Sequence, residues 1–101
     1  MSDIPTTGRL AGIDFGTVRI GISITNPDRS IASPLENYTR GDLSSDQRRF
    51  LRLIEEEGVV GFVVGLPINT DGRETPKSRE AREFGDWIAT VTKLPVVYHD
   101  E

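Results

Sequence analysis

The chain has 101 residues, enough for one domain with a single hydrophobic core. Its net charge is −4, with ten arginines and two lysines against 16 acidic residues, so it lacks the overall basic field that is typical of nucleic-acid-binding domains. It has no cysteine, one histidine (His99) and no apolar run near the ~20 residues of a membrane span, which excludes disulfides, thiolate metal sites, cysteine catalysis and a transmembrane helix.

Three strands are predicted after a disordered tail at residues 1–8. Residues 10–15 form a short apolar run that Gly16 interrupts. Residues 19–25 alternate around three isoleucines, which predicts a strand with one buried face. Residues 31–38 are extended, and Pro34 favours an edge strand. Because residues 1–8 carry no secretory signal pattern, we expect a cytoplasmic protein.

Two helices and two further strands complete the predicted elements. Ser44 is expected to cap the first helix, with Gln47 completing a capping box, and Gly58 to end it. Residues 59–65 are apolar almost throughout, which predicts a strand buried on both faces in a parallel sheet covered by helices. Thr75 is expected to cap the second helix, with Pro76 at its first position, and residues 96–99 to form the last strand.

The order of these elements predicts an α/β domain with a mixed five-stranded sheet. The first three strands can form an antiparallel meander, and the last two follow helical crossovers, so the expected strand order is 3-2-1-4-5. The first and fourth strands are then neighbours from which the chain leaves in opposite directions. Ligands bind at the carboxyl ends of strands at such switch points, and residue 14, the 66–75 loop and residues 100–101 all reach that edge.

Asp14 is the residue that most strongly indicates a function. It stands in the apolar run G-I-D-F-G, where a buried carboxylate is costly unless it is paired or binds a metal. The structural alternative is a surface-facing aspartate on a half-exposed strand, or a turn cap. The glycines at positions 12 and 16 favour close approach of a ligand or of backbone.

Two further groups of polar residues are expected at the same edge. Arg73, Lys77, Arg79 and Arg82 surround the start of the second helix, where phosphate is favoured, although the interleaved glutamates fit an ordinary helix surface equally well. Asp100 and Glu101 follow the last strand and are candidate metal ligands, or else a charged chain end. His99 is interpreted as a sheet residue rather than as a ligand.

Taken together, these motifs resemble the YqgF/RuvX family of Holliday-junction-resolvase-like nucleases, within the RNase H-like fold. The matching segments, in order along the chain, are G-I-D-F-G-T-V-R-I-G (12–21), A-S-P-L (32–35), V-V-G-L-P-I-N-T-D-G (63–72), R-E-F (82–84) and D-E (100–101). Each segment is weak alone, but the ordered set is specific. The resemblance implies one RNase H-like domain over residues 9–101, incomplete at its C-terminal side, because family members usually continue for about another third of their length.

The resemblance also implies site residues, cofactors and partners. Asp14 matches the acid of the family's first strand, and Asp100, with Glu101 beside it, matches the family's D-E-R motif. Arg19 matches the basic residue after the first glycine turn, and Asn69, Asp71 and Gly72 match the loop after the fourth strand. Phosphodiester hydrolysis in this family implies two Mg²⁺ or Mn²⁺ ions, with Asp14 as a ligand of both and Asp100 of one.

The implied substrate is pre-rRNA, processed at the 5′ end of 16S rRNA, or branched DNA. Arg19, Asn69, Asp71, Gly72, Arg73, Lys77 and Arg82 are the implied substrate-binding residues. Three alternatives stay open: a non-catalytic nucleic-acid-binding module of the same fold, a Holliday-junction resolvase, and an actin-like phosphotransfer domain, for whose second lobe 101 residues leave no room. No membrane partner is expected, and the sequence leaves monomer and dimer open.

Overall fold

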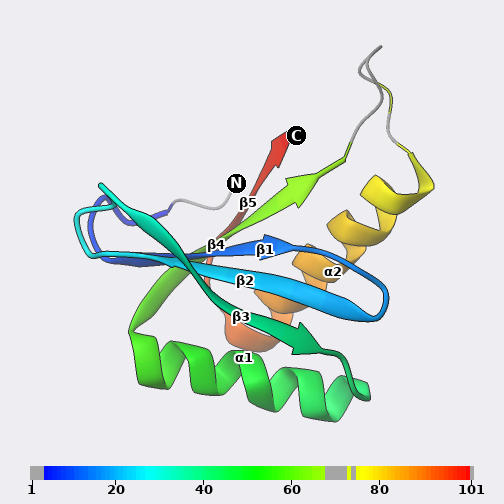
Figure 1. The fold of residues 1–101 in the computed structure, drawn as a ribbon, viewed down its shortest axis with the longest axis horizontal. Helices are drawn as coiled ribbons and strands as arrows, with labels where there is room; N and C mark the ends of the chain where they lie inside the picture. Colours follow the sequence, from blue (N-terminus) through cyan, green and yellow to red (C-terminus); the bar gives the residue numbers. More distant parts are fainter. Residues whose placement is uncertain (1–3, 68–72, 74, 101) are drawn as a thin grey trace.

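A computed structural model describes residues 4–67, 73 and 75–100, with Asp100 described in its backbone only. Five strands and two helices follow one another in the predicted order (Figure 1). Their bounds are β1 (Arg9–Asp14), β2 (Arg19–Thr25), β3 (Ala32–Thr39), α1 (Leu43–Glu57), β4 (Val59–Leu66), α2 (Pro76–Thr92) and β5 (Val96–Asp100).

The sheet has the predicted order β3-β2-β1-β4-β5. β2 pairs antiparallel with both β1 and β3, while β4 pairs parallel with both β1 and β5. The carboxyl ends of β1, β4 and β5 therefore lie at one edge of the sheet. The predicted switch point between β1 and β4 is confirmed.

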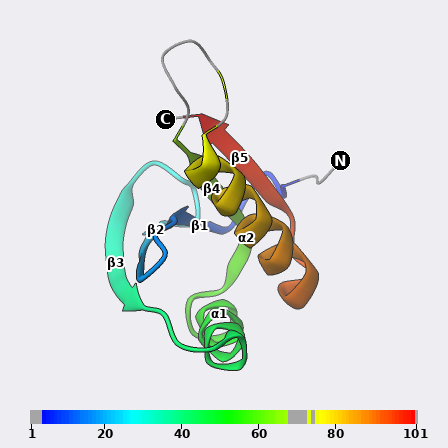
Figure 2. The same ribbon diagram turned by 90° about the vertical axis from the view of Figure 1, so that its right-hand side faces the viewer.

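Both helices cover the same face of the sheet (Figure 2), so the expectation that β4 is buried on both faces was wrong at Val63, which is only half-buried on the open face. The rings of Phe50 in α1 and Phe84 in α2 lie 5.7 Å apart, and Phe50 also contacts Phe62 of β4 at 6.1 Å. Phe62 is fully buried on this face, whereas Val63, the next residue, is only half-buried. A continuous apolar run does not reveal that its second face lacks a covering helix.

The helix ends are set by side-chain caps, one of which differs from the prediction. Asp42, not Ser44, caps α1, because its carboxylate accepts a hydrogen bond from the Ser45 amide at 2.8 Å, and this bond lowers the pKa of Asp42. The C-cap at Gly58 is confirmed by its left-handed backbone, with φ of 68°. The Thr75 cap of α2 is confirmed as well, and it forms a capping box with Ser78.

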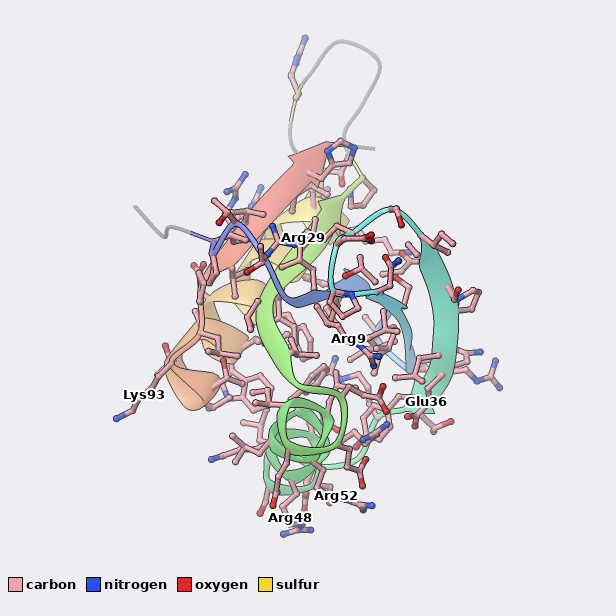
Figure 3. All side chains as sticks on the ribbon, turned by 90° about the vertical axis from the view of Figure 1, so that its left-hand side faces the viewer. Arg9, Arg29, Glu36, Arg48, Arg52 and Lys93 are labelled. Atoms are coloured by element: carbon pink, nitrogen blue, oxygen red, sulfur yellow. The ribbon has the colours of Figure 1, made fainter. Side chains whose placement is uncertain are left out.

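Arginines hold the segment before β1 and the start of β1 (Figure 3). Arg29, in the turn between β2 and β3, donates to the carbonyl of Gly8 at 3.0 Å and to that of Pro5. Arg9, the first residue of β1, forms an ion pair of 3.1 Å with Glu57 at the end of α1. Neither α1 nor α2 has the length and apolar composition needed to cross a bilayer.

Candidate active site

Asp14 is the last residue of β1, at the switch point between β1 and β4, and its side chain is exposed. Of the two interpretations of Asp14, the structure has the surface-facing one, because the strand ends at this residue and its open face is not covered by a helix. No hydrogen bond or ion pair joins Asp14 to another described residue. Its oxygen atoms are thus available to a ligand.

Glycines surround Asp14 on the open face of the sheet. Gly21 of β2 is its cross-strand partner, and a Cβ at position 21 would lie 3.3 Å from the Asp14 Cβ and 3.8 Å from Oδ2. Gly12 precedes Asp14 on the same face, where a Cβ would lie 2.5 Å from the Ser23 Oγ. Gly65 lies on the other side, in β4. The sheet around the carboxylate is therefore bare backbone, which a bulky ligand can approach closely.

This bare floor belongs to a hollow of about 650 Å³ on the open face of the sheet. Pro34, Leu35 and Asn37 of β3 form one wall, and Val63 contributes apolar surface to the floor. A bulge in the pairing of β2 with β3, between Ile22 and Ser23, accompanies the bend of β3 toward this face. No lysine or arginine among the described residues lines the hollow.

Two further polar residues, Asn37 and His99, lie in a row with Asp14 across the sheet. Asn37 is paired with Gly21, and Gly21 with Asp14. On the other side, Gly65 is paired with His99, which lines the hollow as well. The row thus consists of three polar residues, Asn37, Asp14 and His99, separated by Gly21 and Gly65. The prediction that His99 is a sheet residue is confirmed, and it is also a wall of the candidate site.

A polar and aromatic network supports Asp14 from the helix side. The ring of Phe15, the next residue, lies 5.2 Å from that of Phe84, and the Arg40 guanidinium lies 5.4 Å and 5.1 Å from these two rings. Asp46 is fully buried and accepts hydrogen bonds from Arg40 at 3.3 Å and from the Tyr38 hydroxyl at 2.8 Å. This network fixes the backbone immediately after Asp14.

Asp100 ends β5 at the same edge of the sheet, opposite Leu66 of β4. The edge location is as predicted, whereas its side chain and all of Glu101 lie outside the described residues. Two residues earlier, the Tyr98 hydroxyl donates to Asp86 Oδ1 at 2.5 Å and lies 2.9 Å from the carbonyl oxygen of Arg82. Burial, and then the hydrogen bond to Asp86, raise the pKa of Tyr98.

The basic residues that were predicted to bind phosphate or substrate lie at several separate places in the structure. Arg19 is exposed at the start of β2, on the same side of that strand as Gly21, and forms no ion pair within the described part of the chain. Arg73, Lys77 and Arg79 are exposed before and in the first turns of α2. Arg82 stacks over the Tyr98 ring at 5.0 Å, on the helix side of the sheet, and does not line the hollow. Asn69, Asp71 and Gly72 lie outside the described residues.

Asp14 fits part of a divalent metal site. A carboxylate oxygen is the donor that Mg²⁺ prefers, and Asp14 is exposed and without a partner among the described residues. However, no group of three or more His, Cys, Asp or Glu side chains able to hold a metal comes together within residues 4–67, 73 and 75–99. The other expected donors, Asp100 and Glu101, are side chains that the structure does not describe.

Sequence reasoning missed the residues that shape the hollow. Ser23 and Asn37 gave no separate signal, because each is ordinary in an edge or next-to-edge strand. Leu35 belongs to the A-S-P-L segment but was not assigned to the site. Gly21 could have been found, since the alternation of residues 19–25 places Arg19, Gly21 and Ser23 together on the face opposite the isoleucines.

The sequence pattern of the family described as RuvX, Holliday junction resolvase, matches residues 8–101. The chain belongs to this family. A relative from Rhodopirellula baltica, named as a candidate pre-16S rRNA nuclease, is 46% identical over 97 residues. Relatives of the same name from Bradyrhizobium diazoefficiens and Paracoccus denitrificans are 43% and 37% identical. Each match covers 96–97% of this chain, which spans only 56–62% of the length of these relatives.

Solved structures show the same fold. RuvC of Thermus thermophilus, in complex with a Holliday junction substrate, superimposes with a TM-score of 0.63 over 91% of this chain and 64% of RuvC, at 16% identity. A second RuvC structure from T. thermophilus gives a TM-score of 0.60. The chain therefore has an RNase H-like fold.

Proposed function

We propose that this chain carries the catalytic face of an endonuclease that depends on divalent metal ions and processes the 5′ end of pre-16S rRNA. The observation that carries the proposal is the exposed carboxylate of Asp14, at a switch point and on a floor of Gly12, Gly21 and Gly65. Membership of the RuvX family and the names of the relatives support nuclease chemistry and an rRNA substrate.

In this proposal Asp14 and an acid at the end of β5 hold Mg²⁺ or Mn²⁺ between them. When bound, the ions would stabilise charge at the scissile phosphate and lower the pKa of the attacking water. The candidates for the second acid are Asp100 and Glu101. Asp14 would hold the ions through its carboxylate, and the glycines around it leave room for a phosphate and sugar.

The substrate-binding residues are proposed to lie around the rim of the hollow rather than on its floor. Arg19 is exposed beside the end of β1, and Arg73 and Lys77 are exposed near the start of α2. Asn69, Asp71 and Gly72 follow β4 in the chain and are proposed to contact the same substrate. Arg82 is stacked on Tyr98 on the helix side of the sheet. It is proposed to contact only a substrate that extends beyond the edge strand β5.

Branched DNA is the second candidate substrate. The fold superimposes on RuvC in complex with a Holliday junction substrate, with a TM-score of 0.63. In that case the same Asp14 chemistry would act on a four-way DNA junction instead of on rRNA.

The test compares variants in two contexts: the 101-residue chain, and the same chain fused to the part of the R. baltica relative that it does not match. Each is incubated with Mg²⁺ or Mn²⁺ and either a pre-16S rRNA 5′ fragment or a four-way DNA junction. We expect the fusion to cleave the RNA, and Asp14→Asn to abolish cleavage. Asp100→Asn and Glu101→Gln, made separately, identify the second acid.

The outcomes separate the candidates. Preferential cleavage of the junction would favour the resolvase. Metal-independent binding without cleavage by any variant would indicate a binding module. Cleavage that survives Asp14→Asn in the fusion would overturn the proposed role of Asp14.

A further inference from the structure

Two consecutive residues of α2 make contacts close to the two proposed catalytic acids, one with the residue after β1 and one with β5. Phe84 packs on Phe15, the residue after Asp14, with ring centroids 5.2 Å apart. Gly85 faces Tyr98, two residues before Asp100. The helix thus touches β5 and the residue that follows β1 at neighbouring positions, on the face opposite the hollow.

The contact at Gly85 leaves no room for a side chain. A Cβ at position 85 would lie 2.6 Å from the Tyr98 hydroxyl oxygen, 2.7 Å from Cε1 and 2.9 Å from Cζ. Contacts under 3.0 Å are essentially never found for a real Cβ, so either the ring or the helix would have to move. Gly85 is buried in mid-helix, where alanine would otherwise be the more favourable residue.

The Tyr98 ring cannot turn away without losing its partners. Its hydroxyl donates to Asp86 at 2.5 Å, and the Arg82 guanidinium covers the ring at 5.0 Å. Three positions on one side of α2 (82, 85 and 86) thus hold a single side chain of β5.

We infer that Gly85 and Tyr98 are positioning residues of the proposed nuclease, which set where the carboxyl end of β5 lies relative to Asp14. This inference rests on the proposed function. Neither residue touches the hollow or the substrate. Their effect passes through the backbone of β5, because the close approach of α2 at Gly85 fixes the height of Tyr98 above the sheet. A displacement of about 1 Å at a reacting group can cost on the order of 100-fold in rate.

The test is a pair of size changes that compensate each other. Gly85→Ala introduces the clash, and Gly85→Ala/Tyr98→Leu removes the ring tip that causes it. Thr90→Ala, on an exposed position of the same helix, is the matched control for a helix substitution. The first readout is the set of backbone amide chemical shifts of residues 96–99 in the 101-residue chain, and the second is kcat and KM for RNA cleavage by the fusion described above.

We expect Gly85→Ala to shift the amide resonances of β5 and to lower kcat at least tenfold with little change in KM. The double variant should recover part of the kcat that Gly85→Ala loses, because it removes the clash but also the hydroxyl that Asp86 holds. Thr90→Ala should change neither readout. Unchanged β5 resonances in Gly85→Ala would overturn the inference, because they would show that the ring simply turns aside. Shifted resonances with an unchanged kcat would overturn it as well. An unaltered fusion that does not cleave would contradict the proposed function instead, and the amide readout would still decide whether Gly85 fixes β5.

Discussion

Because glycine has no side chain, position 21 leaves space beside Asp14 for a ligand to approach. A Cβ there would lie 3.3 Å from the Asp14 Cβ, tighter than nine in ten real Cβ contacts. We expect Gly21→Ala to displace the carboxylate by a few tenths of an ångström and to reduce cleavage by the fusion about tenfold. The fold should persist, because alanine is tolerated in a strand and position 21 opens onto the hollow.

The measurement for Gly21→Ala is kcat together with the thermal unfolding midpoint. A midpoint within about 2 °C of the unaltered chain, combined with lower kcat, is the expected result. Full activity would show that Asp14 has room to move without consequence. A large fall in the midpoint would show that Gly21 serves the sheet rather than the site.

Ionisation of Tyr98 is expected to lower the stability of the folded chain at alkaline pH. Its pKa is raised in the folded state, by burial and by the hydrogen bond to Asp86, from an ordinary value of 10.0. A raised pKa means that the folded state holds the proton more tightly, so the stabilisation is complete below pH 10 and is lost as pH rises toward the folded pKa. We expect the free energy of unfolding to fall above about pH 10.

The matched variant is Tyr98→Phe, which keeps the ring but cannot ionise. Urea unfolding from pH 8 to pH 11 should show a steeper decline for the unaltered chain than for Tyr98→Phe. Parallel curves for the two proteins would contradict the assignment, since the decline would then come from other groups.

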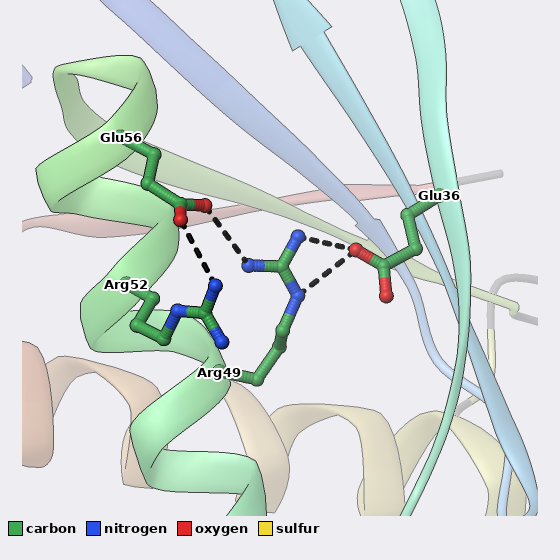
Figure 4. Close-up of polar contacts among 4 residues, drawn as sticks. All are labelled: Glu36, Arg49, Arg52 and Glu56. Atoms are coloured by element: carbon green, nitrogen blue, oxygen red, sulfur yellow. Dashed lines mark hydrogen bonds and ion pairs between the residues drawn. The ribbon is translucent and has the colours of Figure 1, made fainter.

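At the scale of elements, an ion-pair network ties the edge strand β3 to α1 (Figure 4). Arg49 of α1 contacts Glu36 of β3 through two guanidinium nitrogens, one of them 2.9 Å from Oε1, and lies 3.7 Å from Glu56. The hydrogen bond to Glu36 raises the pKa of Arg49. β3 pairs with only one strand, and this contact joins it to α1 together with the hydrogen bond from Tyr38 to Asp46.

We expect Glu36→Gln to loosen β3 more than it destabilises the whole domain. The Arg49 and Glu36 side chains are 19% and 33% exposed, so the loss should be about 1 kcal/mol. Amide hydrogen exchange of residues 37–39 should accelerate, while that of β4 stays slow. The control is Arg52→Gln, which breaks an exposed pair with Glu56 and should cost less than about 0.5 kcal/mol. Equal acceleration in β3 and β4 would contradict the local role of Glu36.

Element order, strand order and helix ends could largely be predicted from the sequence, because they depend on local signals. The alternation of residues 19–25, the cap at Thr75 and the C-cap at Gly58 each follow from neighbouring residues. The cap at Asp42 was missed because Ser44 offers the same local signal. The uncovered face of β4 could not be predicted, since an apolar run looks the same whether one face or both are covered.

For the candidate site, only its location at one edge of the sheet could be predicted from the sequence. Asp14 and the backbone of Asp100 lie at the same edge, as expected, because β4 pairs parallel with both β1 and β5. The line of Asn37, Asp14 and His99 depends on register and on the bend of β3, which short sequence motifs do not encode. The burial of Asp46 beneath Arg40 likewise depends on how α1 meets the sheet.

At the scale of the whole molecule, the distribution of charge opposes the binding of nucleic acid without divalent ions. The chain carries a net charge of −4. Among the described residues, Asp14 and Glu36 are the acids that border the hollow, and no lysine or arginine lines it. The Glu36 carboxylate contacts Arg49 of α1, on the helix side of the sheet. Glu36 is neutralised by Arg49, so Asp14 is the acid most able to repel a phosphate.

We therefore expect Asp14→Asn to have opposite effects on binding and on cleavage. In EDTA, removal of this charge should tighten the binding of an RNA oligonucleotide several-fold, most strongly at low salt, where the repulsion is least screened. With Mg²⁺ present, the unaltered chain should bind more tightly than it does in EDTA, and the variant should gain less. Fluorescence anisotropy at 50 and 200 mM salt measures both effects. The matched control is Asp28→Asn, which removes one exposed negative charge from the turn that follows the far end of β2 and should change neither. Weaker binding by Asp14→Asn in EDTA would show that Asp14 contacts the nucleic acid directly, as a hydrogen-bond acceptor, rather than through a bound cation.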